Sequence, residues 1–279
     1  MIRIITDNAS DITVEEAKKM TVEIVPLTIN FEDESVQQKT AADFDNFYRK
    51  LETVQTLPST SRPSPEDFLK HFEKAKEAGD EVLVLTIDAG SSGTLESAEL
   101  ARGLSGYSEK ITIMDSKQAI MSQRLVVEQA AKLRDAGANM QEIVVYIKDL
   151  RERIVVCGVI NTLKYLKMGG RVPKTMAFIG EAIGIKPIII LGDNGLDELA
   201  KKRGMLAGEK RLWQEMDKFP LDKELPTYFG YTLNREISEN YRQKTIERYD
   251  LTKTGIFPIG GVIGTHVGPN GIGLAFVRK

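Results

Sequence analysis

The sequence predicts an α/β fold, and three observations lead to this prediction. Short apolar runs rich in β-branched residues recur along the 279 residues, and longer stretches with helical spacing separate most of them. One helix start is marked in full, because Ser64 can cap a helix that begins with Pro65, Glu66 and Asp67. Alternating strands and helices of this kind are typical of βαβ units and a largely parallel sheet.

The expected elements follow one another in order along the first two thirds of the chain. Apolar runs predict strands at residues 2–5, 22–29, 82–87, 111–114, 154–160 and 185–191. Helical spacing predicts helices at residues 65–78, 94–104 and 139–153. We therefore expect the first half of the chain to form a parallel sheet covered by helices.

A second domain, of mixed α/β structure, is expected in the later part of the chain. Gly192-Asp-Asn-Gly195 predicts a hairpin turn, and strand candidates follow closely at residues 228–233, 256–259 and 274–277. We place the N-terminal α/β domain at residues 1–158 and the C-terminal mixed domain at residues 159–279. The N-terminal domain would carry the polar turns described below.

Charge and composition exclude several classes of partner. The 38 Lys and Arg residues against 40 Asp and Glu give a formal charge of −2, which argues against a nucleic-acid partner. Cys157 is the single cysteine, so an intrachain disulfide is impossible. The apolar start of the chain is too short for a signal peptide, and no run approaches the roughly 20 residues of a membrane span. We expect a soluble, cytoplasmic protein without an integral membrane segment.

Polar turns follow three of the expected early strands, at residues 6–10, 88–94 and 115–116. The carboxyl ends of parallel strands share one sheet edge, where open α/β folds bind ligands. In the second turn, Gly90 and Gly93 allow close backbone approach, and Ser92 lies at the start of a helix whose amino end attracts anions. These turns favour a site for a small acidic group, although helix capping alone also explains such residues.

Three further segments carry candidate site residues. The two prolines of Leu57-Pro-Ser-Thr-Ser-Arg-Pro-Ser64 hold a row of hydroxyl groups in an extended loop. His266 lies between closely spaced glycines, and its imidazole could donate a hydrogen bond to an anion or neutralise its charge. Arg171 follows a short helix ended by glycine, where it either anchors an anion or satisfies helix-end carbonyls.

Missing motifs narrow the chemistry further. The sequence contains neither a P-loop nor a Gly-x-Gly-x-x-Gly motif, and two histidines with one cysteine make a zinc site improbable. A serine esterase or thioesterase is the alternative, with Ser92 as nucleophile, His266 as base and Asp88 or Asp7 orienting it. Gly90-Ser-Ser-Gly93, however, is not the Gly-x-Ser-x-Gly elbow of that class.

Five segments in the same order resemble the signatures of the DegV family of bacterial fatty-acid-binding proteins. They are Leu57-Pro-Ser-Thr-Ser-Arg-Pro-Ser-Pro65, Ser92-Gly-Thr-Leu-Glu-Ser-Ala98, Thr162-Leu-Lys-Tyr-Leu-Lys-Met-Gly-Gly-Arg-Val172, Lys186-Pro-Ile-Ile189 and Ile263-Gly-Thr-His-Val-Gly-Pro269. The resemblance runs nearly end to end. It implies a two-domain α/β protein that buries one acyl chain in an apolar tunnel and holds the carboxylate at a polar site.

The resemblance also implies partners and residue roles. Some members are the lipid-binding subunit of bacterial fatty acid kinase, in which a separate ATP-binding subunit phosphorylates the bound acid to an acyl-phosphate. The chain would then need no catalytic residue, metal or cofactor of its own, and the fatty acid would be its ligand. The matching carboxylate-binding positions are Thr60, Ser61, Ser92, Gly93 and His266, with Arg171 as a further candidate. Arg203 matches a basic position associated with kinase docking. The apolar residues 176–179 and 182–183 could line the tunnel, although ordinary core packing explains them equally well.

Two departures from the family pattern bear on the ligand. Asp88-Ala-Gly-Ser91 stands where many relatives carry Ser-Ser-Gly-Leu, and a carboxylate at Asp88 would repel a bound fatty acid unless it points elsewhere. Ser122-Gln-Arg124 replaces the usual Gly-x-Gly. The acyl-chain preference therefore stays open, and a third hypothesis is a binding module for a different small carboxylate or lipid regulator without a kinase partner.

Overall fold

The computed structural model describes residues 1–172, 184–193 and 195–279, and it contains a parallel sheet in the first half of the chain. This sheet has the strand order β2-β1-β6-β7, and all its neighbouring strands run parallel. The strands are β1 (Ile2–Asp7), β2 (Val22–Val25), β6 (Glu81–Thr86) and β7 (Ile111–Asp115). The predicted α/β class is confirmed.

Helices cover both faces of this sheet, because alternate residues of each strand are apolar on opposite sides. Ile5 of β1 packs in a cluster with α3 (Pro65–Ala78) and α4 (Thr94–Leu104). Ile4 packs in a cluster with α5 (Ile120–Asp135) and α6 (Met140–Arg153). The predicted start of α3 is confirmed: Ser64 and Asp67 form a capping box, and Pro65 is the first helical residue.

The later part of the chain forms a six-stranded mixed sheet with the order β10-β9-β8-β13-β11-β12. The pair β11–β12 is parallel and the other pairs are antiparallel. The strands are β8 (Ile154–Val159), β9 (Ile185–Gly192), β10 (Gly195–Arg203), β11 (Thr227–Tyr231), β12 (Thr254–Pro258) and β13 (Ile272–Val277). The predicted mixed sheet is confirmed. Its first strand begins at Ile154, while the division into domains at residue 158 stays a prediction.

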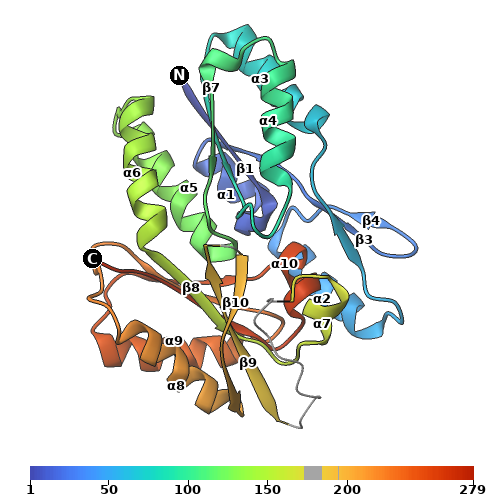
Figure 1. The fold of residues 1–279 in the computed structure, drawn as a ribbon, viewed down its shortest axis with the longest axis vertical. Helices are drawn as coiled ribbons and strands as arrows, with labels where there is room; N and C mark the ends of the chain where they lie inside the picture. Colours follow the sequence, from blue (N-terminus) through green and yellow to red (C-terminus); the bar gives the residue numbers. More distant parts are fainter. Residues whose placement is uncertain (173–183, 194) are drawn as a thin grey trace.

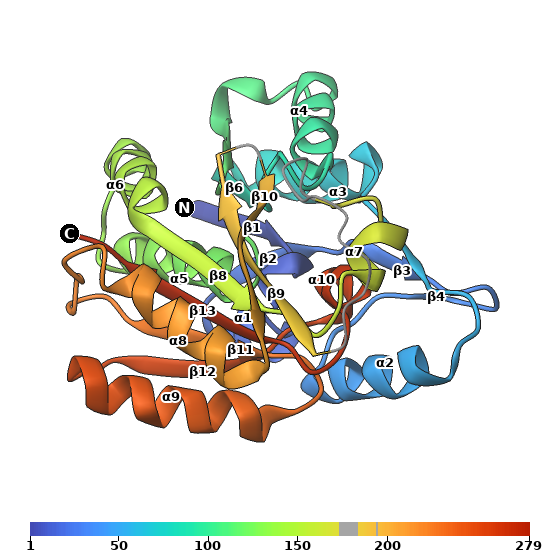
Figure 2. The ribbon, with the colours of Figure 1, turned by 60° about the horizontal axis from the view of Figure 1, so that its bottom comes forward.

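Helices α8 (Met205–Met216) and α9 (Arg235–Tyr249) cover one face of the mixed sheet (Figure 2). The other face packs against α5 and α6, so these two helices lie between the two sheets. The predicted hairpin joins β9 to β10, with Gly192 paired to Gly195; Asn194 lies outside the described residues. The core is therefore continuous from one sheet, through α5 and α6, to the other.

The single strand predicted at residues 22–29 is wrong, because the structure has two strands there. After β2, Pro26 interrupts the run, and β3 (Thr28–Asn30) joins a separate sheet with β4 (Ser35–Val36) and β5 (Ser59–Ser61). Proline has no backbone N–H to donate to a neighbouring strand, which favours a break in the strand at Pro26. The break lets the chain leave the parallel sheet and form a second, smaller sheet beside it.

The remaining helices complete the fold and join its distant parts. They are η1 (Asn8–Ser10), α1 (Val14–Lys19), α2 (Ala41–Thr53), η2 (Ser108–Lys110), α7 (Lys164–Met168) and α10 (Gly261–Val267). Although α10 lies near the C-terminus, it packs against α2, α7, β3 and β5 (Figure 1). The chain thus returns to its first part just before its last strand. None of the helices in the described ranges is both long and apolar enough to cross a bilayer.

Candidate functional site

A mostly apolar cavity lies where the two sheets, α10 and the start of α5 meet. It holds about 1010 Å³ of empty space, the solvent at its mouth included. Its walls include Val156 and Ile160 from the segment of β8, Ile189 from β9 and Val262 from α10. The polar side chains in the described part of its lining are Thr60, Ser91, Ser92, Arg171, Thr232 and His266.

Two members of a row of three glycines, Gly158 and Gly273, form part of the apolar wall. Gly158 of β8 pairs with Gly273 of β13, which pairs with Gly230 of β11. Met121 of α5 lies over this row: a Cβ atom on Gly273 would be 2.6 Å from its Cε, and one on Gly230 would be 3.0 Å from its Sδ. Sequence reasoning missed these residues, because the three glycines become neighbours only through the strand register.

The polar end of the cavity brings together two side chains that are far apart in the sequence. β5 carries Thr60 and α10 carries His266, and Thr60 Oγ1 lies 3.1 Å from His266 Nε2. Thr60 is half-buried and His266 is buried. When the imidazole donates its Nε2 proton to Thr60 Oγ1, the Thr60 hydroxyl proton remains free for an acceptor in the cavity.

Electrostatics keep His266 neutral at physiological pH. Burial, together with the positive charge of Arg171, lowers the pKa of His266 to about 4. Among the described residues, the buried Nδ1 atom has no hydrogen-bond partner, and it packs so closely on Gly169 that a Cβ atom there would collide with it. The sequence suggested two roles for His266, donating a hydrogen bond to an anion or neutralising its charge. A neutral ring can fill the first role and not the second.

Ser92 lies on the same cavity, just before α4. Its hydroxyl is 2.9 Å from that of Thr94, the first residue of the helix. No side chain caps α4, so the positive amino end of this helix is not offset by a capping oxygen. Asp88, which could have repelled a carboxylate, is buried and accepts a hydrogen bond from Ser91 at 2.7 Å. Burial raises the pKa of Asp88 above its usual range, and Asp88 is absent from the described lining.

The other predicted site residues lie in different surroundings. Arg171 lines the cavity and donates to the Gly169 carbonyl at 2.8 Å. Ser61 follows Thr60 on β5, so its side chain points the opposite way, and it accepts from Asn30 Nδ2 at 2.7 Å. Gly93 is pressed against the Arg62 side chain, which donates to its carbonyl at 3.0 Å.

The structure thus brings Thr60, Ser92, Arg171 and His266 to one cavity, whereas Ser61 and Gly93 are absent from its described lining. A smaller pocket adjoins the polar end and shares Thr60, Arg171 and His266 with it. Arg203 is exposed at the end of β10. The candidate tunnel residues 176–179 and 182–183 lie outside the described residues.

The residues proposed for a serine hydrolase do not assemble into a triad within the described part of the chain. The Ser92 hydroxyl pairs with that of Thr94, and the His266 ring pairs with Thr60. The Asp7 carboxylate accepts from the Ile87 amide at 2.7 Å and from Gln123 at 3.1 Å, which ties β1 to its neighbours. The geometry therefore favours binding over nucleophilic catalysis.

Comparison with known proteins identifies close relatives of this fold. A family model described as "Uncharacterised protein, DegV family" matches residues 1–279. A DegV domain-containing protein of Caldanaerobacter subterraneus is 29% identical and covers 100% of this chain and 99% of its own length. A stearic-acid-binding protein from Eubacterium ventriosum is 27% identical, with a TM-score of 0.90 over 100% of this chain and 99% of that chain.

A third relative is connected with a kinase. The Streptococcus pneumoniae fatty acid kinase B3 protein, whose crystal structure contains linoleic acid, has a TM-score of 0.85 to this chain. The likeness covers 100% of both chains at 21% identity. At that identity the likeness concerns the fold.

Proposed function

The chain belongs to the DegV family, and from that premise we propose that it binds one long-chain fatty acid, with the acyl chain buried and the carboxylate held by hydroxyl groups and His266. The observation that carries the proposal is the apolar cavity, whose few polar side chains include the neighbouring Thr60, Arg171 and His266. A related protein of the same fold, at 27% identity, binds stearic acid. The cavity and this relative point to the same class of ligand.

The apolar wall would supply most of the affinity. At ~0.8 kcal/mol for each buried methylene, a chain of about fourteen methylenes contributes on the order of 11 kcal/mol of gross transfer free energy before ordering costs. The glycine row and Met121 leave the sheet surface apolar, so no polar group along this wall has to lose water without a new partner.

The polar end would supply orientation. A buried carboxylate costs several kcal/mol unless donors meet it, and the hydroxyl groups of Thr60 and Ser92 can act as such donors. His266 would polarise the Thr60 hydroxyl by donating to its oxygen, and Arg171 would add a positive charge at the same end. No reacting side chain of this protein is needed for this role, and the fatty acid would be its ligand without a further cofactor.

Mass spectrometry of an organic extract from the purified chain tests the proposal. We expect close to one fatty acid per chain, and a stripped chain should take up added fatty acid in the same proportion. A different small carboxylate in the extract, or a chain that neither carries nor binds a fatty acid, would contradict the proposal. Steady turnover of a chromogenic acyl ester that is lost in Ser92→Ala would favour the hydrolase instead.

We further propose that this protein is a cytoplasmic carrier that presents the carboxylate to a separate ATP-dependent kinase subunit, which forms the acyl-phosphate. The fold shared with the pneumococcal kinase B3 protein supports this, and the smaller polar pocket beside His266 lies at the end where the carboxylate would be held. The exposed Arg203 would contribute to docking.

The kinase proposal can be tested with the ATP-binding subunit from the same organism, by trapping the acyl-phosphate with hydroxylamine. We expect ATP-dependent acyl hydroxamate only when both proteins are present. Arg203→Ala should lower the rate severalfold without changing fatty-acid binding, whereas Lys202→Ala, the neighbouring exposed cation, is the control. No product with the wild-type pair would contradict the kinase role, and equal rates for Arg203→Ala and the control would contradict docking through Arg203.

A further inference from the structure

The helix that carries His266 is held at its start by side chains from the first forty residues of the chain. The Gly260 amide donates to Asp11 Oδ1 at 2.9 Å, and the Gly261 amide donates to Gln38 Oε1 at 2.5 Å. Asp11 and Gln38 are both buried. We call this pair of acceptors the clamp. It joins positions that are 249 and 223 residues apart in the sequence.

Helix α10 depends on such external partners. It has only seven residues, too few for a helix to be stable on its own, and its N-cap is Gly260, which has no side chain to accept from the first amides. The glycines also bring the backbone close to the clamp, because a Cβ atom on Gly260 would lie 2.7 Å from Asp11 Oδ1. The clamp therefore supplies the acceptors that the helix lacks.

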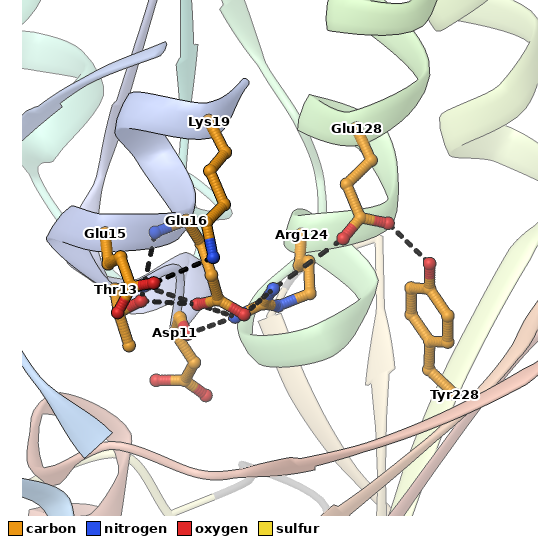
Figure 3. A network of polar contacts seen from close by, with 8 residues as sticks. All are labelled: Asp11, Thr13, Glu15, Glu16, Lys19, Arg124, Glu128 and Tyr228. Atoms are coloured by element: carbon orange, nitrogen blue, oxygen red, sulfur yellow. Dashed lines mark hydrogen bonds and ion pairs between the residues drawn. The ribbon is translucent and has the colours of Figure 1, made fainter. Parts of the chain in front are cut away.

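Asp11 is itself held by a charged network around the buried Arg124, drawn in Figure 3. Arg124, whose side chain is 4% exposed, donates to the Asp11 carbonyl at 2.5 Å and to both oxygens of Glu16 at 3.0 Å. On its other side, Arg124 pairs with Glu128 at 3.7 Å, and Glu128 accepts from the Tyr228 hydroxyl. Figure 3 shows the Asp11 carboxyl group pointing away from the guanidinium, free to face α10.

This network accounts for one of the departures from the family pattern. Arg124 belongs to the segment Ser122-Gln-Arg124, which departs from the Gly-x-Gly expected from the family resemblance, and its guanidinium lies 4.3 Å from the centre of the Phe257 ring. Burial tends to raise the pKa of Glu16, but the hydrogen bonds and charge of Arg124 outweigh it and lower the pKa to about 2. Glu16 is thus an ionised partner for Arg124, and the pair fixes the Asp11 backbone in its left-handed conformation, with a φ of 55°.

We propose that Asp11 and Gln38 are positioning residues for the fatty-acid head group, which act by fixing α10 so that His266 meets Thr60. The inference rests on the proposed function and deepens it. His266 is the sixth residue of α10, so a small rotation or fraying of the helix moves its ring away from Thr60 Oγ1. Neither Asp11 nor Gln38 appears in the described lining of the cavity.

Variants of Asp11 must respect its backbone conformation. Asparagine and glycine both adopt a positive φ readily, whereas alanine would add strain of its own. Asp11→Asn keeps an oxygen that can accept from the Gly260 amide. Burial raises the pKa of Asp11 to about 8 and so favours its neutral carboxyl group, which the asparagine side chain resembles in shape. Asp11→Gly removes the acceptor. Asp250→Gly is the matched control, because Asp250 has a φ of 52° and is exposed at the end of α9.

The two histidines allow a direct readout of helix position. The NMR signals of His266 report on α10, and those of His71 serve as an internal reference, because His71 lies in α3 and pairs with Glu23. In Asp11→Gly we expect palmitate affinity to fall at least fivefold and the His266 pKa to rise toward its ordinary value as water reaches the ring. Asp11→Asn should bind palmitate within twofold of the wild-type affinity. Asp250→Gly should have the wild-type affinity, and the His71 signals should stay the same in every variant.

Gln38→Met removes the other acceptor of the clamp and provides a second test. If Asp11→Gly does not fold, the result for Gln38→Met alone tests whether the clamp positions His266. This substitution should lower palmitate affinity and shift His266 in the same direction. Wild-type affinity together with unshifted His266 signals in the folded variants would overturn the inference. Failure of the wild-type chain to bind palmitate would instead reject the proposed function, and the His266 signals would then still show whether the clamp fixes α10.

Discussion

At the scale of single residues, the pair Thr60 and His266 shows what a site needs beyond the right residue types. The sequence indicates a hydroxyl group and an imidazole, but their meeting at 3.1 Å depends on β5 and α10 being packed together. The surroundings of His266 also matter, because burial and the positive charge of Arg171 lower its pKa and keep the imidazole neutral. The neutral pair can donate to a carboxylate without a permanent counter-charge.

Removing the Thr60 hydroxyl should weaken ligand binding with little effect on folding. Thr60→Val keeps the shape of the side chain, and a hydrogen bond to a charged group is worth about 1.5 kcal/mol, so we expect about a tenfold loss of palmitate affinity. Ser61→Ala, at the next position but facing Asn30, is the control and should bind as the wild type does. Isothermal titration calorimetry measures both. Equal losses in the two variants would contradict the assigned head-group contact.

The neutral state of His266 also predicts how stability depends on pH. Its pKa is about 4 in the folded chain, below the value of about 6.5 expected when unfolded, so the unfolded state takes up the proton first as the pH falls. The stability that comes from His266 is present above pH 6.5 and is lost progressively toward pH 4. Between pH 7 and pH 5 the loss should be about 2 kcal/mol.

Urea unfolding of the ligand-free chain at pH 7 and pH 5 measures this loss. The carboxyl groups also titrate, so the comparison is with His266→Asn, in which the contribution from His266 is absent. We expect a shallower decline in that variant. Parallel declines in the wild type and His266→Asn would show that His266 is not buried in its neutral form.

At the scale of elements, strand register decides which glycines stand side by side beneath Met121. Gly158, Gly230 and Gly273 belong to β8, β11 and β13. The sequence does not show that they align, because the alignment depends on how β13 pairs with β8 and with β11. By contrast, local chemistry was sufficient for the capping box of Ser64 and for the hairpin between β9 and β10. Local signals predict where elements start, and packing decides what they form together.

The contact between Met121 and the glycine row predicts a shift in acyl-chain preference. Met121 is 1% exposed and touches Gly273, which lines the cavity, so Met121→Ala should extend the apolar space beside the sheet. We expect this variant to retain longer chains from an equimolar mixture of saturated C14 to C20 acids, measured by mass spectrometry of the bound fraction. It should also lose roughly 2–5 kcal/mol of stability.

Met114→Ala is the matched control for that experiment. Met114 is a buried methionine of β7, 5% exposed, in the same apolar cluster but absent from the described cavity lining. It should be destabilised similarly and keep the wild-type preference. A shift of the same size in both variants would mean that loss of stability, and not cavity length, changes the bound acid.

At the scale of the whole molecule, the cavity is built from both ends of the chain. Strands β8 and β9 and helix α10 supply walls, but Thr60 and Ser92 come from the first hundred residues. The sequence pattern predicted the two kinds of sheet, and the motif resemblance predicted the residues of the polar end. Neither could predict that α10 packs into the first half of the molecule, because this contact rests on Asp11 and Gln38, whose neighbours in sequence carry no signal for it.

A ligand in such a cavity should stabilise the whole chain, because β8, β9, α10 and the turn before α4 all contribute to its walls. At a free ligand concentration of about 100 times Kd, the free energy of unfolding should rise by about 2.7 kcal/mol. Urea unfolding of stripped and palmitate-loaded chains measures this rise, with acetate as the control ligand that has a carboxylate but no acyl chain. Acetate should leave the stability nearly unchanged, because the apolar wall supplies most of the affinity. Equal stabilisation by palmitate and by acetate would contradict an acyl chain buried in this cavity.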